Sequence, residues 1–210
     1  MTKGFLPPQQ QRSRETSALL IAATLTTLEK HGLDGATIPR IASAAGVAPA
    51  SVYRRFRDRN ALYRVALLDA LERSTDQNEL NEKFRQKTLK GLVHQIVQVT
   101  LQQYRSRPGL MRALTRFVES DSDEEFRTQA LHCVASNFNS LAEKLIVYRD
   151  QIQHPNPRKA IMFALLTTAT VAEARVLEQV SMWQELTRMT DKEFTTEAAK
   201  SFLGYLGCRR

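Results

Sequence analysis

The chain has 210 residues, 42% of them apolar, so it is long enough to bury one small and one medium-sized core. Its two cysteines do not suggest a disulfide framework and fit a reducing compartment. No uncharged apolar run reaches the roughly 18 residues of a membrane span. We therefore expect a cytoplasmic protein without signal peptide or membrane anchor. Its net charge of +8 favours a polyanionic partner such as nucleic acid, although basic enzymes also exist.

The first 14 residues predict a flexible basic tail. Pro7 and Pro8 precede three glutamines, and a segment of this composition cannot bury a core. The positive charge is concentrated in the first third of the chain. Residues 1–75 carry 11 Lys and Arg against 6 Asp and Glu, a net of +5, whereas the other 135 residues have a net of +3. This distribution points to the N-terminal third as the part that meets a polyanion.

Apolar residues at steps of three and four predict helices along almost all of the remaining chain, and we find no alternating strand pattern. A helix over about 15–30 ends at Gly32, and a second, over about 37–45, has Pro39 in its first turn. A third begins at Pro49. The fourth, from about 60, carries Leu62, Val65, Leu68 and Leu71 on one face. Beyond a polar stretch at 73–86, five more are expected at about 87–105, 109–119, 123–149, 158–182 and 191–206. An acidic run at 121–125 favours a helix N-terminus over a metal site.

The stretch from residue 37 to residue 56 reads TIPRIASAAGVAPASVYRRF. Ile41, Ala42 and Val52 are spaced to pack inward, and Gly46 permits a tight turn between two short helices. The second of these helices begins with small outward residues, which suits a helix whose N-terminal end enters a major groove. Arginines lie at the C-terminal end of this helix and beyond it, where they would meet the phosphates of the DNA backbone. The pattern predicts a helix-turn-helix; the alternative is an amphipathic three-helix segment with a solvated basic face.

Over about residues 15–72 the sequence resembles the tetracycline-repressor-like family of bacterial regulators. The resemblance is carried by Thr37, Ile41-Ala42, Ala45-Gly46-Val47, Ser51, Tyr53, Arg55 and Phe56, and it continues in Arg59 and Leu62, while Asn60 replaces the usual acid. It implies an all-α protein with a three-helix DNA-binding domain at 15–73 and a helical ligand-binding and dimerisation domain at 74–210. It also implies that the Tyr53 hydroxyl contacts a phosphate. The expected DNA-contacting residues are Thr37, Arg40, Pro49, Ala50, Ser51, Tyr53, Arg54, Arg55 and Arg59.

The segment 160–177 is apolar on nearly every side at its start, so it must be covered on all sides. In a domain this small, we expect a second subunit to supply one cover, and the family resemblance implies a four-helix bundle across a twofold axis. The alternative is a core helix within one chain. The predicted interface comprises Leu165, Leu166, Ala169, Ala172, Phe202 and Leu206.

Candidates for an effector pocket are polar and aromatic residues along apolar faces of the C-terminal part. They are Tyr104, Phe117, His132, Asn137, Phe138 and Met162, and the alternative for each is an ordinary core position. We find no spacing typical of metal ligands, no phosphate-binding glycine loop and no nucleophile motif. The chain is therefore expected to use no metal or cofactor and to catalyse no reaction.

The leading hypothesis is a dimeric repressor in the bacterial cytoplasm that binds a palindromic double-stranded DNA operator and is released by a small, largely apolar effector. In this hypothesis the helix from residue 60 packs on the first helix through Leu62 and Val65 and joins the DNA reader to the sensor. One alternative is an architectural or scaffold DNA-binding protein without effector. Another is a small helical enzyme acting on an apolar ligand, against which the missing catalytic constellation weighs.

Overall fold

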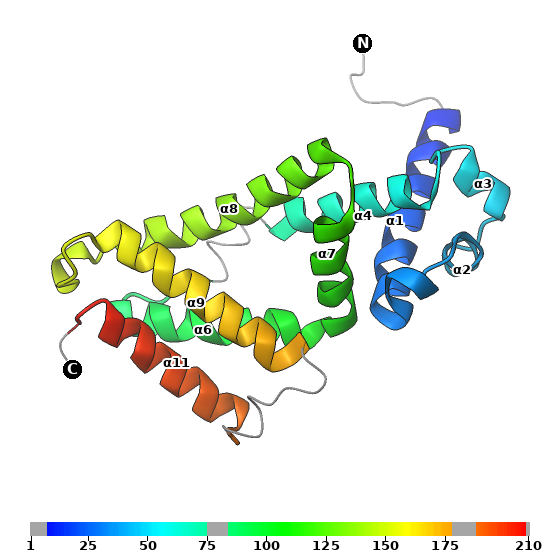
Figure 1. The fold of residues 1–210 in the computed structure, drawn as a ribbon. Helices are drawn as coiled ribbons and strands as arrows, with labels where there is room; N and C mark the ends of the chain where they lie inside the picture. Colours follow the sequence, from blue (N-terminus) through cyan, green and yellow to red (C-terminus); the bar gives the residue numbers. More distant parts are fainter. Residues whose placement is uncertain (1–7, 75–83, 178–187, 209–210) are drawn as a thin grey trace, which may run out of the picture. The chain divides into compact units, whose positions relative to one another are not determined.

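The computed structural model describes residues 8–74, 84–177 and 188–208. Within these ranges the chain is helical and contains no strand, which confirms the all-α prediction (Figure 1). A single 3-10 turn, η1 (Arg149–Gln151), joins two of the helices. The α-helices are α1 (Pro8–Gly35), α2 (Ile38–Ala44), α3 (Pro49–Tyr53), α4 (Arg59–Ser74), α6 (Leu89–Ser106), α7 (Pro108–Ser120), α8 (Glu124–Ile146), α9 (Pro157–Leu177) and α11 (Asp191–Tyr205).

The chain forms two compact units. The first contains α1, α2, α3 and α4 as far as Leu71, together with Gly109–Ala130, which comprises nearly all of α7 and the start of α8. The second contains the remainder: Glu72–Pro108 and the chain from Leu131 onward. The boundary expected after residue 73 lies close to the break at Leu71. That expectation, however, does not place Gly109–Ala130 with the N-terminal helices, so the first unit is discontinuous in sequence.

Helix α1 begins earlier than the sequence suggests. The tail expected over residues 1–14 is helical from Pro8, and its first seven residues lie outside the described ranges. Glutamine and arginine are good helix formers, and a proline is well accommodated in a first turn, so the composition of 8–14 is compatible with a helix. The expected stop at Gly32 is seen as a break in helical geometry (φ 63°, ψ −173°), after which one more turn leads to Gly35.

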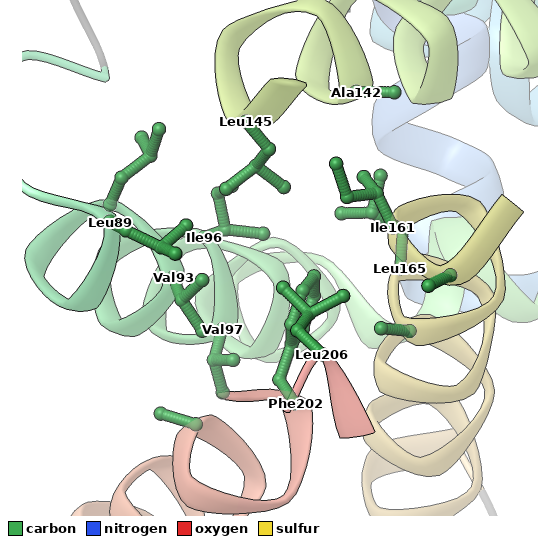
Figure 2. Close-up of a cluster of buried hydrophobic side chains, with 14 of the residues drawn as sticks. Leu89, Val93, Ile96, Val97, Ala142, Leu145, Ile161, Leu165, Phe202 and Leu206 are labelled. Carbon is green, nitrogen blue, oxygen red and sulfur yellow. The ribbon is translucent and has the colours of Figure 1, made fainter. Parts of the chain in front are cut away.

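The second unit is built around a hydrocarbon core (Figure 2). Val93 and Val97 of α6 lie beside Phe202 of α11, and Leu145 of α8 faces Ile96 of α6. Helix α9 packs against both α6 and α11. Each buried leucine, isoleucine or phenylalanine contributes about 1.5–3 kcal/mol relative to an exposed one, so burial of this cluster stabilises the unit strongly.

Burial corrects the predicted dimer interface. Leu165, Ala172, Phe202 and Leu206 are between 0 and 3% exposed within a single chain, because α6, α9 and α11 pack against one another. They are core residues and offer no free surface. Ala169 is half-buried, and of the six only Leu166 is a largely exposed side chain, at 55%.

Among the described residues, α9 is the one helix long and apolar enough to cross a membrane by length and composition. Its buried positions include Ile161, Ala164 and Leu165, which pack in the core of the second unit. Contact with α6 and α11 accounts for the buried third of this apolar stretch, while Phe163, Leu166 and Val171 stay exposed.

Candidate nucleic-acid interface

Helices α2 and α3 form the predicted helix-turn-helix. Ile41 and Ala42 of α2 and Val52 of α3 are completely buried. Between the helices Gly46 adopts φ +68°, a conformation that glycine takes without steric cost, and the Val47 N–H donates to the Ala42 carbonyl at 2.9 Å. Thr37 is the N-cap of α2, but its side chain makes no capping hydrogen bond there. Its hydroxyl is thereby left available to another partner.

The outward face of α3 has the exposure that groove entry requires. Pro49, Ala50, Tyr53 and Arg54 are exposed, and the Tyr53 side chain is 60% accessible, while Ser51 is half-buried. The Arg54 guanidinium donates to the Ser51 hydroxyl at 2.8 Å. The small residues at the start of the helix would let its backbone approach base edges closely.

Four arginines around α3 keep their positive charge unneutralised. Arg40 donates to the Gly35 carbonyl at 2.8 Å, and Arg55 donates to the Ser51 carbonyl at 3.0 Å. The Arg59 guanidinium lies 5.5 Å from the centre of the Tyr63 ring. Within the described part of the chain, neither these three arginines nor Arg54 forms an ion pair with a carboxylate. Arg57, by contrast, lies 3.7 Å from Asp58.

Tyr63 of α4 is a functional candidate that the sequence patterns missed. It is 1% exposed, and its hydroxyl lies 3.0 Å from the Leu33 carbonyl and 2.5 Å from the Ala36 carbonyl. Burial raises the pKa of Tyr63, Arg59 lowers it and Asp34 raises it, with a net increase that keeps the hydroxyl protonated as a donor.

The predicted apolar face of α4 is partly wrong. Val65 is 42% exposed, because the helix turns Leu62, Tyr63, Ala66 and Leu67 inward instead. The spacing of these four positions, i, i+1, i+4 and i+5, is itself a helical signal that would have identified Tyr63.

A buried ion pair joins α4 to the end of α7. The Arg64 guanidinium donates to both carboxylate oxygens of Asp121, at 3.0 and 2.7 Å, and also lies 3.3 Å from Asp123. The Asp121 side chain is 1% exposed. Burial raises the pKa of Asp121, but hydrogen bonds from the Arg64 guanidinium and the Asp123 N–H outweigh it, so the net pKa lies below its usual range. Asp123 in turn accepts from the Phe126 N–H and caps α8, as the acidic run predicts.

The opposite end of α7 is held by α1. The Glu29 carboxylate accepts from the Gly109 N–H at 3.2 Å and from the Leu110 N–H at 2.6 Å, so it caps the N-terminus of α7. A Cβ at Gly109 would lie 2.0 Å from the Glu29 carbonyl oxygen, which makes this position one for glycine. Between these ends, Phe117 packs edge-on against Tyr63 and Phe126, with ring centres 5.5 and 5.4 Å apart.

The structure does not gather the six candidate pocket residues. Phe117 belongs to the first unit and His132 is exposed on α8. Phe138 and Met162 pack against the core of the second unit, and the Asn137 amide donates to the Ser74 hydroxyl at 3.0 Å. Burial, with Glu173 nearby, raises the pKa of Tyr104 to about 12. No group of acidic, histidine or cysteine side chains in the described ranges could hold a metal ion.

A helix-turn-helix followed by a larger helical unit is an architecture typical of helical DNA-binding regulators. Residues 20–66 match the family model of bacterial regulatory proteins of the tetR family. The resemblance seen in the sequence is thus confirmed over these residues, and the chain has the fold of solved TetR-family transcriptional regulators.

Solved structures share this fold at low sequence identity. A TetR-family transcriptional regulator from Mesorhizobium loti MAFF303099 is 19% identical, with a TM-score of 0.72 over 93% of this chain and 97% of the other. The fatty acid degradation regulator FadR from Bacillus halodurans is 18% identical, with a TM-score of 0.68 over 98% and 100%. FadR from Bacillus subtilis, solved with stearoyl-CoA, is 14% identical, with a TM-score of 0.60 over 90% and 96%. No curated protein matches the chain in sequence.

Proposed function

We propose that this chain is a ligand-responsive repressor that binds a palindromic DNA operator as a homodimer and is released by a small, largely apolar effector. The observation that carries the DNA-binding part is the exposed face of α3, flanked by Arg40, Arg54, Arg55 and Arg59 without carboxylate partners in the described ranges. TetR-family regulators are generally non-enzymatic DNA-binding proteins, and we propose the same for this chain, in the bacterial cytoplasm.

The contacting residues divide into two groups by chemistry. Pro49, Ala50 and Ser51 stand at the start of α3, where base edges are read, and Thr37 offers a hydroxyl at the start of α2. The groups proposed to contact phosphates are the four arginines and the Tyr53 hydroxyl. Phosphate contacts position a protein on the duplex, whereas the first group would set sequence preference.

A second copy of the chain is the proposed cover for the exposed faces of α9 and α11. Phe163 and Leu166 of α9 are 49 and 55% exposed, and Phe163 lies 5.2 Å from the ring of Tyr205 on α11. Gly204, one residue earlier, has open space around it. An exposed apolar stripe with small neighbouring residues suits close packing of two symmetry-related helix pairs. Leu166→Glu should therefore halve the mass seen by sedimentation, while Val147→Glu, at a 75% exposed position just after the end of α8, should leave the dimer intact.

The proposed effector class is supported by the apolar core of the second unit and by two fold neighbours, a fatty acid degradation regulator and a transcriptional regulator that are both named FadR. One of them was solved with stearoyl-CoA, so that compound is the first to test. Binding of the effector must lower the affinity for DNA, and binding of DNA must lower the affinity for the effector by the same factor. Such coupling typically changes each affinity by about 5- to 150-fold.

The test begins with enrichment of duplexes from a randomised DNA pool by the full-length protein. A palindromic enriched sequence is expected, and Arg55→Ala should weaken its binding and lower the salt dependence by about one phosphate contact. Arg158→Ala is the matched control, because Arg158 pairs with Glu143 in the second unit. Failure to enrich any duplex contradicts the proposal. If stearoyl-CoA binds but leaves DNA affinity unchanged, the scaffold alternative is the better one.

A further inference from the structure

We propose that Tyr63 is a positioning residue for DNA binding, which holds the guanidinium of Arg59 ready for a phosphate and fixes the loop in front of α2. The inference rests on the proposed DNA-binding function and adds to it a buried residue that never touches the nucleic acid. Tyr63 connects three features of the first unit: Arg59, the loop between α1 and α2, and Phe117 of α7.

The ring orients Arg59 without cancelling its charge. The Arg59 guanidinium lies 5.5 Å from the ring centre, a cation–π arrangement, and the side chain is half-buried. A carboxylate in the same place would hold the guanidinium but neutralise it. An aromatic face restricts the motion of the long side chain and leaves its positive charge available, so less freedom is lost when a phosphate arrives.

The hydroxyl of Tyr63 binds the loop between α1 and α2, which leads into the helix-turn-helix. Its oxygen lies within hydrogen-bond distance of the carbonyls of Leu33 and Ala36, which flank the end of α1, and Thr37 directly follows as the N-cap of α2. Helix α2 packs against α3. The position of the outward face of α3 therefore depends on a hydrogen bond donated from α4.

Packing against neighbouring side chains fixes the conformation of the Tyr63 ring. Tyr63 is 1% exposed, and Phe117 packs against it edge-on, itself backed by Phe126. A side chain whose rotamer is locked by packing can hold a functional group within a fraction of an ångström. An ordinary core tyrosine also needs an acceptor for its hydroxyl, but it does not need an arginine on the face of its ring.

The experiment uses full-length protein and the duplex that the wild type enriches, with affinity measured at 50 and 200 mM salt. One phosphate contact contributes about 0.9 to the slope of log affinity against log salt. Raising the salt from 50 to 200 mM should therefore weaken DNA binding by Arg59→Ala about 3.5-fold less than it weakens DNA binding by the wild type. Tyr63→Leu should show the same reduced salt dependence, although leucine removes no charge. The double variant should show no further reduction.

Tyr63→Phe separates the two tasks. It keeps the ring and should keep the wild-type salt dependence, while affinity at each salt concentration falls roughly 2- to 10-fold through the lost hydrogen bond. A folded Tyr63→Leu with the wild-type salt slope, or an effect that adds fully to that of Arg59→Ala, overturns the ring's role. Unchanged affinity of Tyr63→Phe overturns the role of the hydroxyl.

The remaining outcomes of the experiment are also decisive. If Tyr63→Leu does not fold by circular dichroism, Phe117→Leu takes its place, since it frees one edge of the ring; it should give part of the slope reduction, and an unchanged slope overturns the proposal. If the wild type enriches no duplex, the proposed function fails and this inference with it. Wild-type binding with unchanged salt slopes in the variants overturns only the inference.

Discussion

The first unit places charged and hydroxyl groups at the contacts between its helices, whereas the core of the second unit is hydrocarbon. Asp121 is buried under Arg64, and Glu29 caps α7. In the second unit, Arg158 pairs with Glu143 at the surface, with both side chains at least half exposed, and Asp191 is about half exposed where it pairs with the largely buried Arg175. Hydrogen bonds and ion pairs are directional, so they fix the geometry of neighbouring helices, while hydrocarbon packing tolerates volume-conserving changes. The unit that carries the candidate interface is the one with fixed geometry.

The largest expected loss of stability is in the hydrocarbon core. Leu145 is completely buried, and Leu145→Ala removes its contacts and leaves a cavity, which costs about 3–4 kcal/mol. Val147→Ala, two residues further along the chain and 75% exposed, is the control and should change the free energy of unfolding by less than about 0.5 kcal/mol. Chemical denaturation measures both, and a loss below about 1 kcal/mol for Leu145→Ala would contradict the assignment of this core.

The next effect breaks the close approach of α1 and α7. Gly109→Ala forces a methyl group against the Glu29 carbonyl, so the two helices must separate, at a cost of about 2–3 kcal/mol. Gly204→Ala meets open space in α11 and should be neutral or slightly stabilising, because alanine favours helix. Thermal unfolding of the two variants side by side distinguishes steric contact from a general intolerance of helical glycine substitution.

A smaller, pH-dependent effect is expected for Arg64→Met. Without Arg64, Asp121 is a buried and poorly compensated carboxylate, which costs about 2 kcal/mol at pH 7. The pKa of Asp121 lies below its unfolded value, so this stabilisation is present above about pH 4 and is lost as pH falls through the folded pKa. The difference between wild type and variant should therefore shrink below pH 4. A difference that stays constant down to pH 3 would show that packing, and not charge, is responsible.

The smallest expected difference compares one residue type at the same helix position in the two units. Thr190 caps α11 in a capping box with Glu193, and Thr190→Ala should cost about 1 kcal/mol. Thr37 makes no capping hydrogen bond, so Thr37→Ala should cost less than about 0.5 kcal/mol in stability. If its hydroxyl serves DNA, as proposed, the same variant should weaken binding to the enriched duplex.

The sequence predicted the local features of the candidate site well. Periodicity located α2, Gly46 and Pro49 identified the turn and the start of α3, and the inward positions Ile41, Ala42 and Val52 are buried. These features depend on residues within one or two turns of each other, where steric preferences decide the conformation.

Long-range pairings could not be predicted from one sequence. Nothing in the spacing of Arg64 and Asp121, 57 residues apart, indicates that they meet, and Phe117 was expected in an effector pocket because an isolated aromatic fits either place. Four of the six predicted dimer residues proved to be core residues for a related reason. An all-round apolar helix does not reveal which of its sides a neighbouring helix in the same chain covers, and α6 and α11 cover Leu165 and Ala172.

The discontinuity of the first unit has a consequence for the order of folding during synthesis. Glu29 meets its partners 80 and 81 residues later, and Phe126 completes the aromatic contacts around Tyr63. At bacterial and eukaryotic rates of roughly 5–20 residues per second, the ribosome needs roughly 3–11 s to travel from residue 71 to residue 126. During that interval the helix-turn-helix exists on the nascent chain without the helix that closes its core. The first unit therefore reaches its final form only when more than half of the chain has been made.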